Sequence, residues 1–138
     1  MGVPRVILLD THAWVWWVAD PAHLPDAARH AIQESLDEGE PVRVSAISTW
    51  EVAMLVSRGR LELTTDVADW IAHNEAAPEI TFVPVDNRIA LRSVQLVDFD
   101  HRDPADRLIA ATALGLNAVL LTADARLRAY APLVTVWD

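Results

Sequence analysis

Short apolar runs alternate with helical segments along most of this chain. The runs at residues 6–9 and 119–121 are continuously apolar, a pattern typical of strands that are buried on both faces of a sheet. Strands separated by helix-forming segments predict parallel pairing, because each crossover returns the chain to the same edge of the sheet. The sequence therefore predicts an α/β fold with a central parallel sheet of about five strands.

The expected elements follow from apolar periodicity and from helix-capping and turn residues. Strands are expected at residues 5–9, 42–46, 80–85, 118–121 and 134–137, and Pro84 indicates an edge strand or the end of one. A first helix is expected to open at Thr11, and further helices at 25–37, 48–57, 65–75, 86–96, 104–115 and 124–129. Neither a repeat nor a linker divides the 138 residues, so a single domain, 1–138, is expected.

Composition excludes several classes of protein. The net charge of −9 argues against a protein that coats nucleic acid, although local arginines can still serve a nuclease site. All 11 basic residues are arginine, which excludes mechanisms that need a lysine, such as P-loop nucleotide binding. No apolar run approaches the ~20 residues that span a bilayer. Together with the lack of a signal peptide and of cysteine, this predicts no membrane association and a cytoplasmic location.

Four acidic residues occupy positions that a parallel sheet would gather at one edge. Asp10 ends the first apolar run and Asp124 follows the run at 119–121, while Glu51 and Asp106 fall in the first turns of expected helices. Two carboxylates ~5 Å apart repel by roughly 3 kcal/mol at an effective dielectric of about 20. A cluster of four therefore points to a hard cation, Mg²⁺ or Mn²⁺, and to metal-assisted hydrolysis of a phosphodiester.

Each acid also has a purely structural interpretation. Asp10 and Asp124 are placed to cap the helices that follow them. Ser48 and Glu51 form a capping-box pattern, and Asp103 with Pro104 marks a helix start that Asp106 would stabilise as an acid in the first turn. The shared position of the four acids at the same end of their units favours a site, because independent caps would not need to converge.

These segments resemble the PIN-domain family, and within it the bacterial VapC-type toxin ribonucleases. The resemblance rests on four segments in the same order along the chain, at residues 6–12, 45–51, 103–113 and 121–124. It implies a three-layer α/β/α fold and a Mg²⁺- or Mn²⁺-dependent endoribonuclease, in which the cation activates water for attack on an RNA phosphate. It also implies two protein partners, a second copy of the chain and an antitoxin.

The resemblance implies a role for particular residues. Asp10, Glu51, Asp106 and Asp124 would form the catalytic acidic pocket, with Asp10, Asp106 and Asp124 as metal ligands. Asp103, one helical turn before Asp106, and Thr122 are expected beside the metal ligands, with helix capping as the alternative role for Asp103. The RNA target, the base preference and the number of metal ions stay open.

Weaker signals concern the basic and aromatic residues. Arg107 is the preferred candidate for contact with the RNA backbone; the other candidates are Arg58, Arg60, Arg102, Arg126 and Arg128. No metal-ligand role is assigned to His12 or His101, because neither has a second nitrogen ligand at a suitable spacing. Trp14, Trp17, Trp50 and Trp70 are expected in the core, and Trp16 at a surface for a partner.

Two other functions compete with the ribonuclease hypothesis. A phosphatase or a phospho-accepting receiver domain also places aspartates at strand ends, but both classes use a lysine, which the chain lacks. A non-catalytic PIN-like module that binds RNA or protein would fit the same fold. The full set of four acids argues against that module, and metal-dependent cleavage of RNA would separate the two.

Overall fold

Five parallel strands form the centre of the molecule. The structure, a computed structural model, describes residues 5–138. The strands are β1 (Ile7–Leu9), β2 (Val42–Ser45), β3 (Ile80–Val83), β4 (Val119–Leu121) and β5 (Val134–Val136). They lie in the order β3-β2-β1-β4-β5, and every pair is parallel, which confirms the predicted sheet. β3 is an edge strand, as Pro84 indicated.

Helices connect the strands. They are α1 (Thr11–Ala19), α2 (Asp26–Asp37), α3 (Ala46–Ser57), α4 (Val67–Ala76), α5 (Asn87–Val94), α6 (Pro104–Leu116) and α7 (Ala125–Ala129), with a short 3₁₀ helix, η1 (Pro21–His23), after α1. The prediction for α3 was wrong at its start, because Ser45 and not Ser48 caps it by accepting the amide of Ile47. The capping box of Ser48 and Glu51 therefore does not exist.

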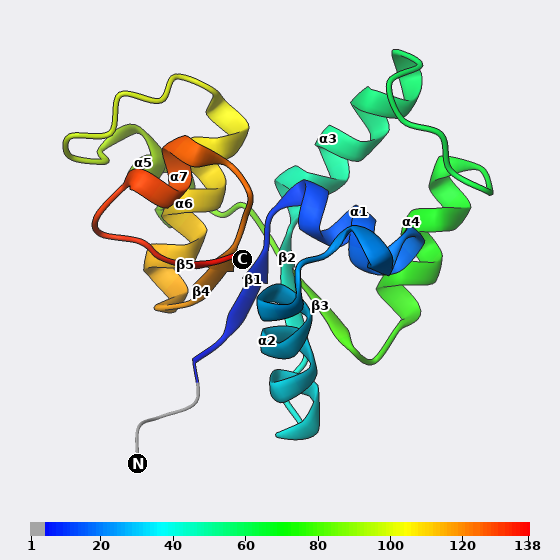
Figure 1. Cartoon of the computed structure of the whole chain (residues 1–138). Helices are drawn as coiled ribbons and strands as arrows, with labels where there is room; N and C mark the ends of the chain where they lie inside the picture. Colours follow the sequence, from blue (N-terminus) through cyan, green and yellow to red (C-terminus); the bar gives the residue numbers. More distant parts are fainter. Residues whose placement is uncertain (1–4) are drawn as a thin grey trace.

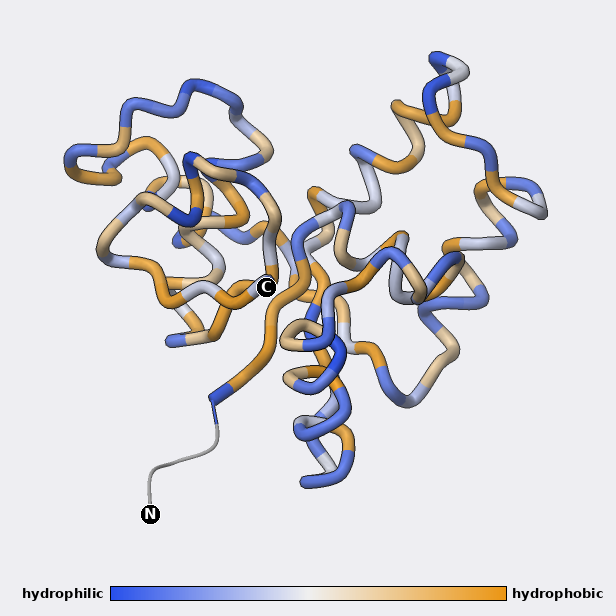
Figure 2. Tube along the Cα trace, viewed as in Figure 1, coloured by the Kyte–Doolittle hydropathy of each residue, from blue (hydrophilic) through white to orange (hydrophobic). Residues whose placement is uncertain are grey.

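The sheet has a helical layer on each face, which completes the three-layer α/β/α architecture (Figure 1). Alternate residues of β1 point to opposite faces, as the period of a strand requires. Ile7 and Leu9 pack in a core with α1, α2, α3 and α4, whereas Leu8 packs in a second core with α6 and α7. All three residues are buried, which explains why β1 is apolar along its whole length (Figure 2).

The core contains two of the four tryptophans expected there. Trp14 is fully buried and its ring lies 4.8 Å from that of Trp70, which is 7% exposed. Trp17 is partly buried against the core. Trp50 was predicted wrongly, because it is 55% exposed. The buried face of α3 runs through Ser48 and Val52, and a residue midway between them in sequence points to the opposite side of the helix.

Trp16 was expected at an exposed surface, but it is partly buried. Its ring lies 5.6 Å from that of Trp137 and stacks at 5.5 Å on His23. The buried face of α1 instead runs through Ala13, Trp14 and Val15. The helix is apolar on nearly all sides, so its sequence carries almost no angular signal from which to choose a buried face.

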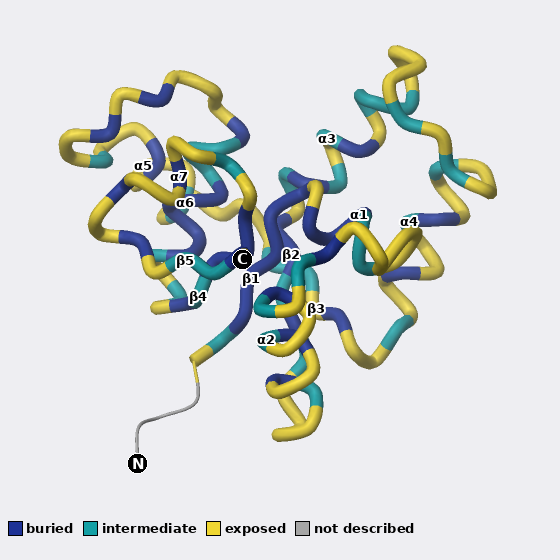
Figure 3. Tube along the Cα trace, viewed as in Figure 1, coloured by how far each residue is buried: buried dark blue, intermediate teal, exposed yellow. Residues whose placement is uncertain are grey.

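The order of the strands fixes where a site can form. From β1 the chain moves outward through β2 and β3, and then returns to the other side of β1 with β4 and β5. The direction of winding reverses between β1 and β4, and ligands of open α/β sheets bind at this point, beyond the carboxyl ends of the strands. All residues of the central strand β1 are buried, whereas the outer turns are exposed (Figure 3). No helix within residues 5–138 is long and apolar enough to cross a membrane.

Asn74 provides a test of the core around Trp14. Its Oδ1 accepts the indole N–H of Trp14 at 3.0 Å, and its amide nitrogen donates to the carbonyl of Trp70 at 2.8 Å. Asn74→Ala leaves a buried indole N–H without a partner, so we expect the free energy of unfolding to fall by about 1–3 kcal/mol. Urea unfolding measures this, with Asn87→Ala on the exposed start of α5 as the control. An equal effect of the two substitutions would contradict the account.

Candidate active site

Asp10 lies at the carboxyl end of β1, next to β4. Its backbone amide donates to the carbonyl of Leu121 at 3.0 Å and extends the β1–β4 pairing by one residue. Its Oδ1 accepts the amide of Thr11 at 2.6 Å, and its Oδ2 accepts the hydroxyl of Thr122 at 2.6 Å. The carboxyl group is buried, and burial raises its pKa against the opposing effect of these hydrogen bonds. Asp10 is therefore held in one orientation at the winding reversal.

Glu51 reaches the same edge from α3. Its Oε1 lies 2.6 Å from the hydroxyl of Thr11, which in turn lies 2.8 Å from the hydroxyl of Ser48. This tie to α1 replaces the capping box expected from the sequence. The pKa of Glu51 is raised to about 7, mainly by burial and also by the charges of Asp106 and Asp10, against the hydrogen bond from Thr11.

Asp106 enters from the first turn of α6. Its Oδ2 lies 2.5 Å from Nε2 of His101. Burial raises the pKa of Asp106 to about 6 and outweighs the hydrogen bond with His101, which lowers it. The charges of Asp10, Asp103 and Asp124 also raise this pKa, so these carboxylates lie close enough to repel one another.

Asp124 and Asp103 each cap a helix and also belong to the acidic cluster. Asp124 accepts the amides of Arg126 and Leu127 at the start of α7, at 2.9 and 3.0 Å. Its own amide donates to the hydroxyl of Thr122 at 3.0 Å, so Thr122 links Asp124 to Asp10. Asp103 caps α6 by accepting the amide of Ala105 at 2.9 Å. The structural and functional interpretations made from the sequence are therefore compatible.

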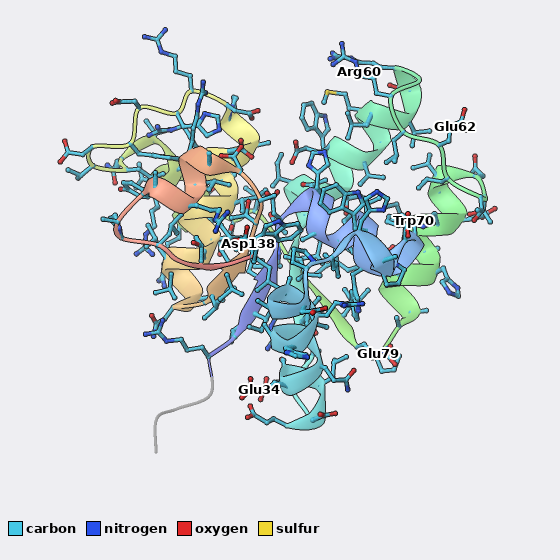
Figure 4. All side chains as sticks on the ribbon, viewed as in Figure 1. Glu34, Arg60, Glu62, Trp70, Glu79 and Asp138 are labelled. Carbon is cyan, nitrogen blue, oxygen red and sulfur yellow. The ribbon has the colours of Figure 1, made fainter. Side chains whose placement is uncertain are left out.

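The four acids predicted from the sequence meet at one edge of the sheet. They arrive from β1, α3, α6 and the loop after β4. One ligand atom from each of His101, Asp106 and Asp124 lies within 4.8 Å of the others. Other acids, such as Glu34, Glu62 and Glu79, lie at the periphery (Figure 4). Several carboxylate oxygens at one place are the donors that hard divalent cations prefer.

His101 belongs to this cluster, although no role was assigned to it from the sequence. Besides its contact with Asp106, its Nδ1 lies 3.1 Å from a guanidinium nitrogen of Arg126. The loop that carries it has no regular structure, so no periodicity indicated where the ring would point. The signal available was its place a few residues before Asp106.

Arg107 has a role in the fold. Its guanidinium donates to the carbonyls of Ser93, Phe99 and His101, at 2.8, 2.8 and 2.9 Å. These bonds tie α5 and the following loop to α6. Contact between Arg107 and RNA stays a prediction. It would use guanidinium N–H groups other than those that donate to these three carbonyls.

Two hollows border the acidic cluster. On one side, Glu51 and Asp103 line a largely apolar hollow together with Trp50, Met54 and Pro104. A second hollow, beside His101, is lined by Arg102 and Arg126 together with Asp98 and Asp100. The site thus adjoins an apolar surface with an exposed indole and a surface that carries two arginines and two aspartates.

Comparison with known proteins places this arrangement in a family. The model of the PIN domain matches residues 7–133. Ribonuclease VapC22 of Mycobacterium tuberculosis is 37% identical over 134 residues, which cover 95% of this chain and 98% of the relative.

Solved structures share the fold at low sequence identity. VapBC2 from Rickettsia felis, bound to a promoter DNA fragment, has a TM-score of 0.71 and 16% identity, with 96% of this chain and 99% of that chain covered. FitAcB from Neisseria gonorrhoeae has a TM-score of 0.63 and 22% identity, with 94% and 96% covered. The sequence match along nearly the whole chain, together with the five-stranded parallel sheet, shows that this protein belongs to the PIN-domain family.

Proposed function

We propose that this protein is a metal-dependent endoribonuclease and the toxin of a toxin–antitoxin pair. The observation that carries the proposal is the convergence of Asp10, Glu51, Asp106 and Asp124 at the winding reversal of the sheet. Carboxylates this close repel one another, and a divalent cation among them relieves that repulsion. The relative named as a ribonuclease supports RNA as the substrate.

The proposed metal site uses Asp10, Asp106 and Asp124 as ligands for Mg²⁺ or Mn²⁺. Their carboxylate oxygens are suitable ligands for a hard cation. Hydrogen bonds from Thr11 and Thr122 hold the Asp10 carboxylate in a fixed orientation before a cation binds. When bound, the cation would supply the Lewis acidity that polarises a phosphate oxygen and activates water. Thr122, through its bonds to Asp10 and Asp124, would hold two of the ligands in register.

The remaining groups would handle the proton and the substrate. Glu51 faces the proposed ligands from α3, so its carboxylate would hold the attacking water or accept a proton from it. Arg102 and Arg126 line the hollow beside His101 and would contact the RNA backbone there. This arrangement requires no covalent intermediate.

Protein partners form part of the proposal. Solved structures that share this fold are described as VapBC and FitAB complexes and as a toxin–antitoxin complex from Klebsiella pneumoniae. Exposed apolar side chains near the site and on α5, Trp50, Leu91 and Val94, would be covered by an antitoxin or a second copy of the chain. A cytoplasmic location, without membrane association, follows from an RNA substrate within the cell.

Cleavage of RNA tests the proposal directly. Purified protein incubated with a mixed cellular RNA pool should give discrete fragments with Mg²⁺ or Mn²⁺ and none with EDTA. Asp106→Asn should abolish the fragments, while its thermal midpoint without metal should equal or exceed that of the wild type, because charge repulsion is relieved. Asp69→Asn on the exposed face of α4 is the control and should cleave normally.

The outcomes of this experiment are distinct. Cleavage that persists in Asp106→Asn would show that the site is wrong. A folded wild-type protein that binds RNA without cutting it in either metal would favour a non-catalytic PIN-like module.

The raised pKa values predict how stability depends on pH without metal. Glu51 and Asp106 have pKa values of about 7 and about 6, above their ordinary values of 4.5 and 3.8, so the folded chain binds protons more tightly than the unfolded chain. Their contribution to stability is fully present below about pH 4 and is lost as the pH rises through 6 and 7. Thermal melts in EDTA should therefore show a falling midpoint over this range.

Two comparisons isolate the cause. Glu51→Gln should flatten the upper part of the pH dependence, because the amide does not titrate. Mn²⁺ at about 100 times its Kd should add about 2.7 kcal/mol of stability at neutral pH, since it binds only the folded chain. A thermal midpoint that rises between pH 5 and 7 in EDTA would contradict the proposed metal site. So would a midpoint that does not change when Mn²⁺ is added.

A further inference from the structure

A chain of three side chains leads from the surface to Asp106. A guanidinium nitrogen of Arg126 lies 3.1 Å from Nδ1 of His101, and Nε2 of the same ring lies 2.5 Å from Oδ2 of Asp106. The side chains of His101 and Asp106 are 8% and 16% exposed, so water has little access to their contact. The contacts join α7, the loop before α6 and α6 itself.

The donors and acceptors of this chain allow only one arrangement of hydrogens. Every N–H of a guanidinium is a donor and none of its nitrogens accepts. Nδ1 of His101 must therefore present its lone pair to Arg126. The ring hydrogen then sits on Nε2, where it is donated to Oδ2 of Asp106. The tautomer is assigned from these partners.

The surroundings hold the imidazole in this position. The ring of Phe99 contacts His101 edge-on, with centroids 5.7 Å apart, and stacks on Tyr130 at 4.5 Å. The hydroxyl of Tyr130 donates to the carbonyl of Val97 at 2.7 Å. Arg107 donates to the carbonyl of His101 itself. An otherwise irregular loop is thus fixed both before and at the histidine.

These contacts also argue against His101 as a metal ligand. A nitrogen ligand needs a free lone pair directed at the cation. The lone pair of Nδ1 accepts from Arg126, and Nε2 carries the hydrogen that is donated to Asp106. With both nitrogens committed, His101 acts on the site through Asp106.

We propose that Arg126, by donating to Nδ1, holds the imidazole of His101 in place, and that His101 in turn fixes the Asp106 carboxylate for the cation through its Nε2–H. His101 and Arg126 are then positioning residues of the metal site. The inference rests on the proposed function, since Asp106 is a metal ligand only there. Its consequence is that a surface arginine on α7 controls a ligand on α6, separately from any contact that the same arginine makes with RNA.

Metal affinity without RNA tests the role of His101. Titration calorimetry with Mn²⁺ alone should give an affinity about 10- to 100-fold weaker for His101→Ala than for the wild type. His101→Gln should restore most of the affinity, because its amide nitrogen is as many bonds from the backbone as Nε2 and also donates. His73→Gln on α4 is the matched control. Thermal melts confirm that each variant is folded.

A double-mutant cycle tests the role of Arg126. Loss of the guanidinium changes the charge near the cation whatever stands at position 101, so this effect cancels in the cycle. Arg126→Gln should therefore weaken Mn²⁺ binding more in the wild type than in the His101→Gln background, where there is no imidazole to hold in place. Arg128→Gln removes an equal charge from the same helix, where Arg128 pairs with Asp138 at 2.8 Å, and should show no such coupling.

Nitrogen-15 spectra of the imidazole groups give a readout independent of metal. We expect the resonances that disappear in His101→Gln to report a hydrogen on Nε2 and a hydrogen-bonded lone pair on Nδ1, and the Nδ1 resonance to shift in Arg126→Gln, where that donor is lost. A hydrogen on Nδ1 in the wild type would overturn the inference, as would unchanged Mn²⁺ affinity in His101→Ala. A wild type that binds no Mn²⁺ would contradict the proposed function, and this inference with it. A wild type that binds Mn²⁺ only as tightly as its variants would contradict this inference alone.

Discussion

The burial of several carboxylates at one place, where they lose hydration and repel one another, is the constraint that the site depends on. Asp10, Glu51 and Asp106 all lose hydration at one edge of the sheet, and burial is the largest cause of their raised pKa values. This arrangement lowers the stability of the folded chain unless other groups at the site compensate for the lost hydration and the repulsion. The surrounding hydroxyls do so in part, through Thr11 on Glu51 and Thr122 on Asp10. A divalent cation would compensate the remainder, so the cost in stability and the proposed activity have the same origin.

The acids also help to build the scaffold that gathers them. Asp10, Asp103 and Asp124 each accept backbone amides at the start of a helix. Helix starts and strand ends coincide at the carboxyl edge of a parallel sheet, so residues that begin the helices necessarily surround the winding reversal. Capping therefore fixes the carboxylates before any ligand binds, and one set of residues serves the fold and the site.

The sequence predicted the features that depend on local pattern. The buried runs of β1 and β4 and the acids that follow them were sufficient for the sheet and for the position of Asp10 and Asp124. Pattern failed where tertiary contacts decided the outcome. Trp50 was expected in the core because its side chain is large and apolar, but α3 buries the opposite face of the helix. The role of His101 depends on a contact with Arg126, 25 residues away, which no spacing rule reveals.

Locating the ion would test the central claim most directly. A crystal soaked in Mn²⁺ and measured at its absorption edge reports the position of the metal without reference to activity. We predict an anomalous peak bounded by the carboxylates of Asp10, Asp106 and Asp124, at the carboxyl ends of β1 and β4. A peak at another cluster, or none at saturating Mn²⁺ in a crystal whose solvent reaches this edge, would contradict the account.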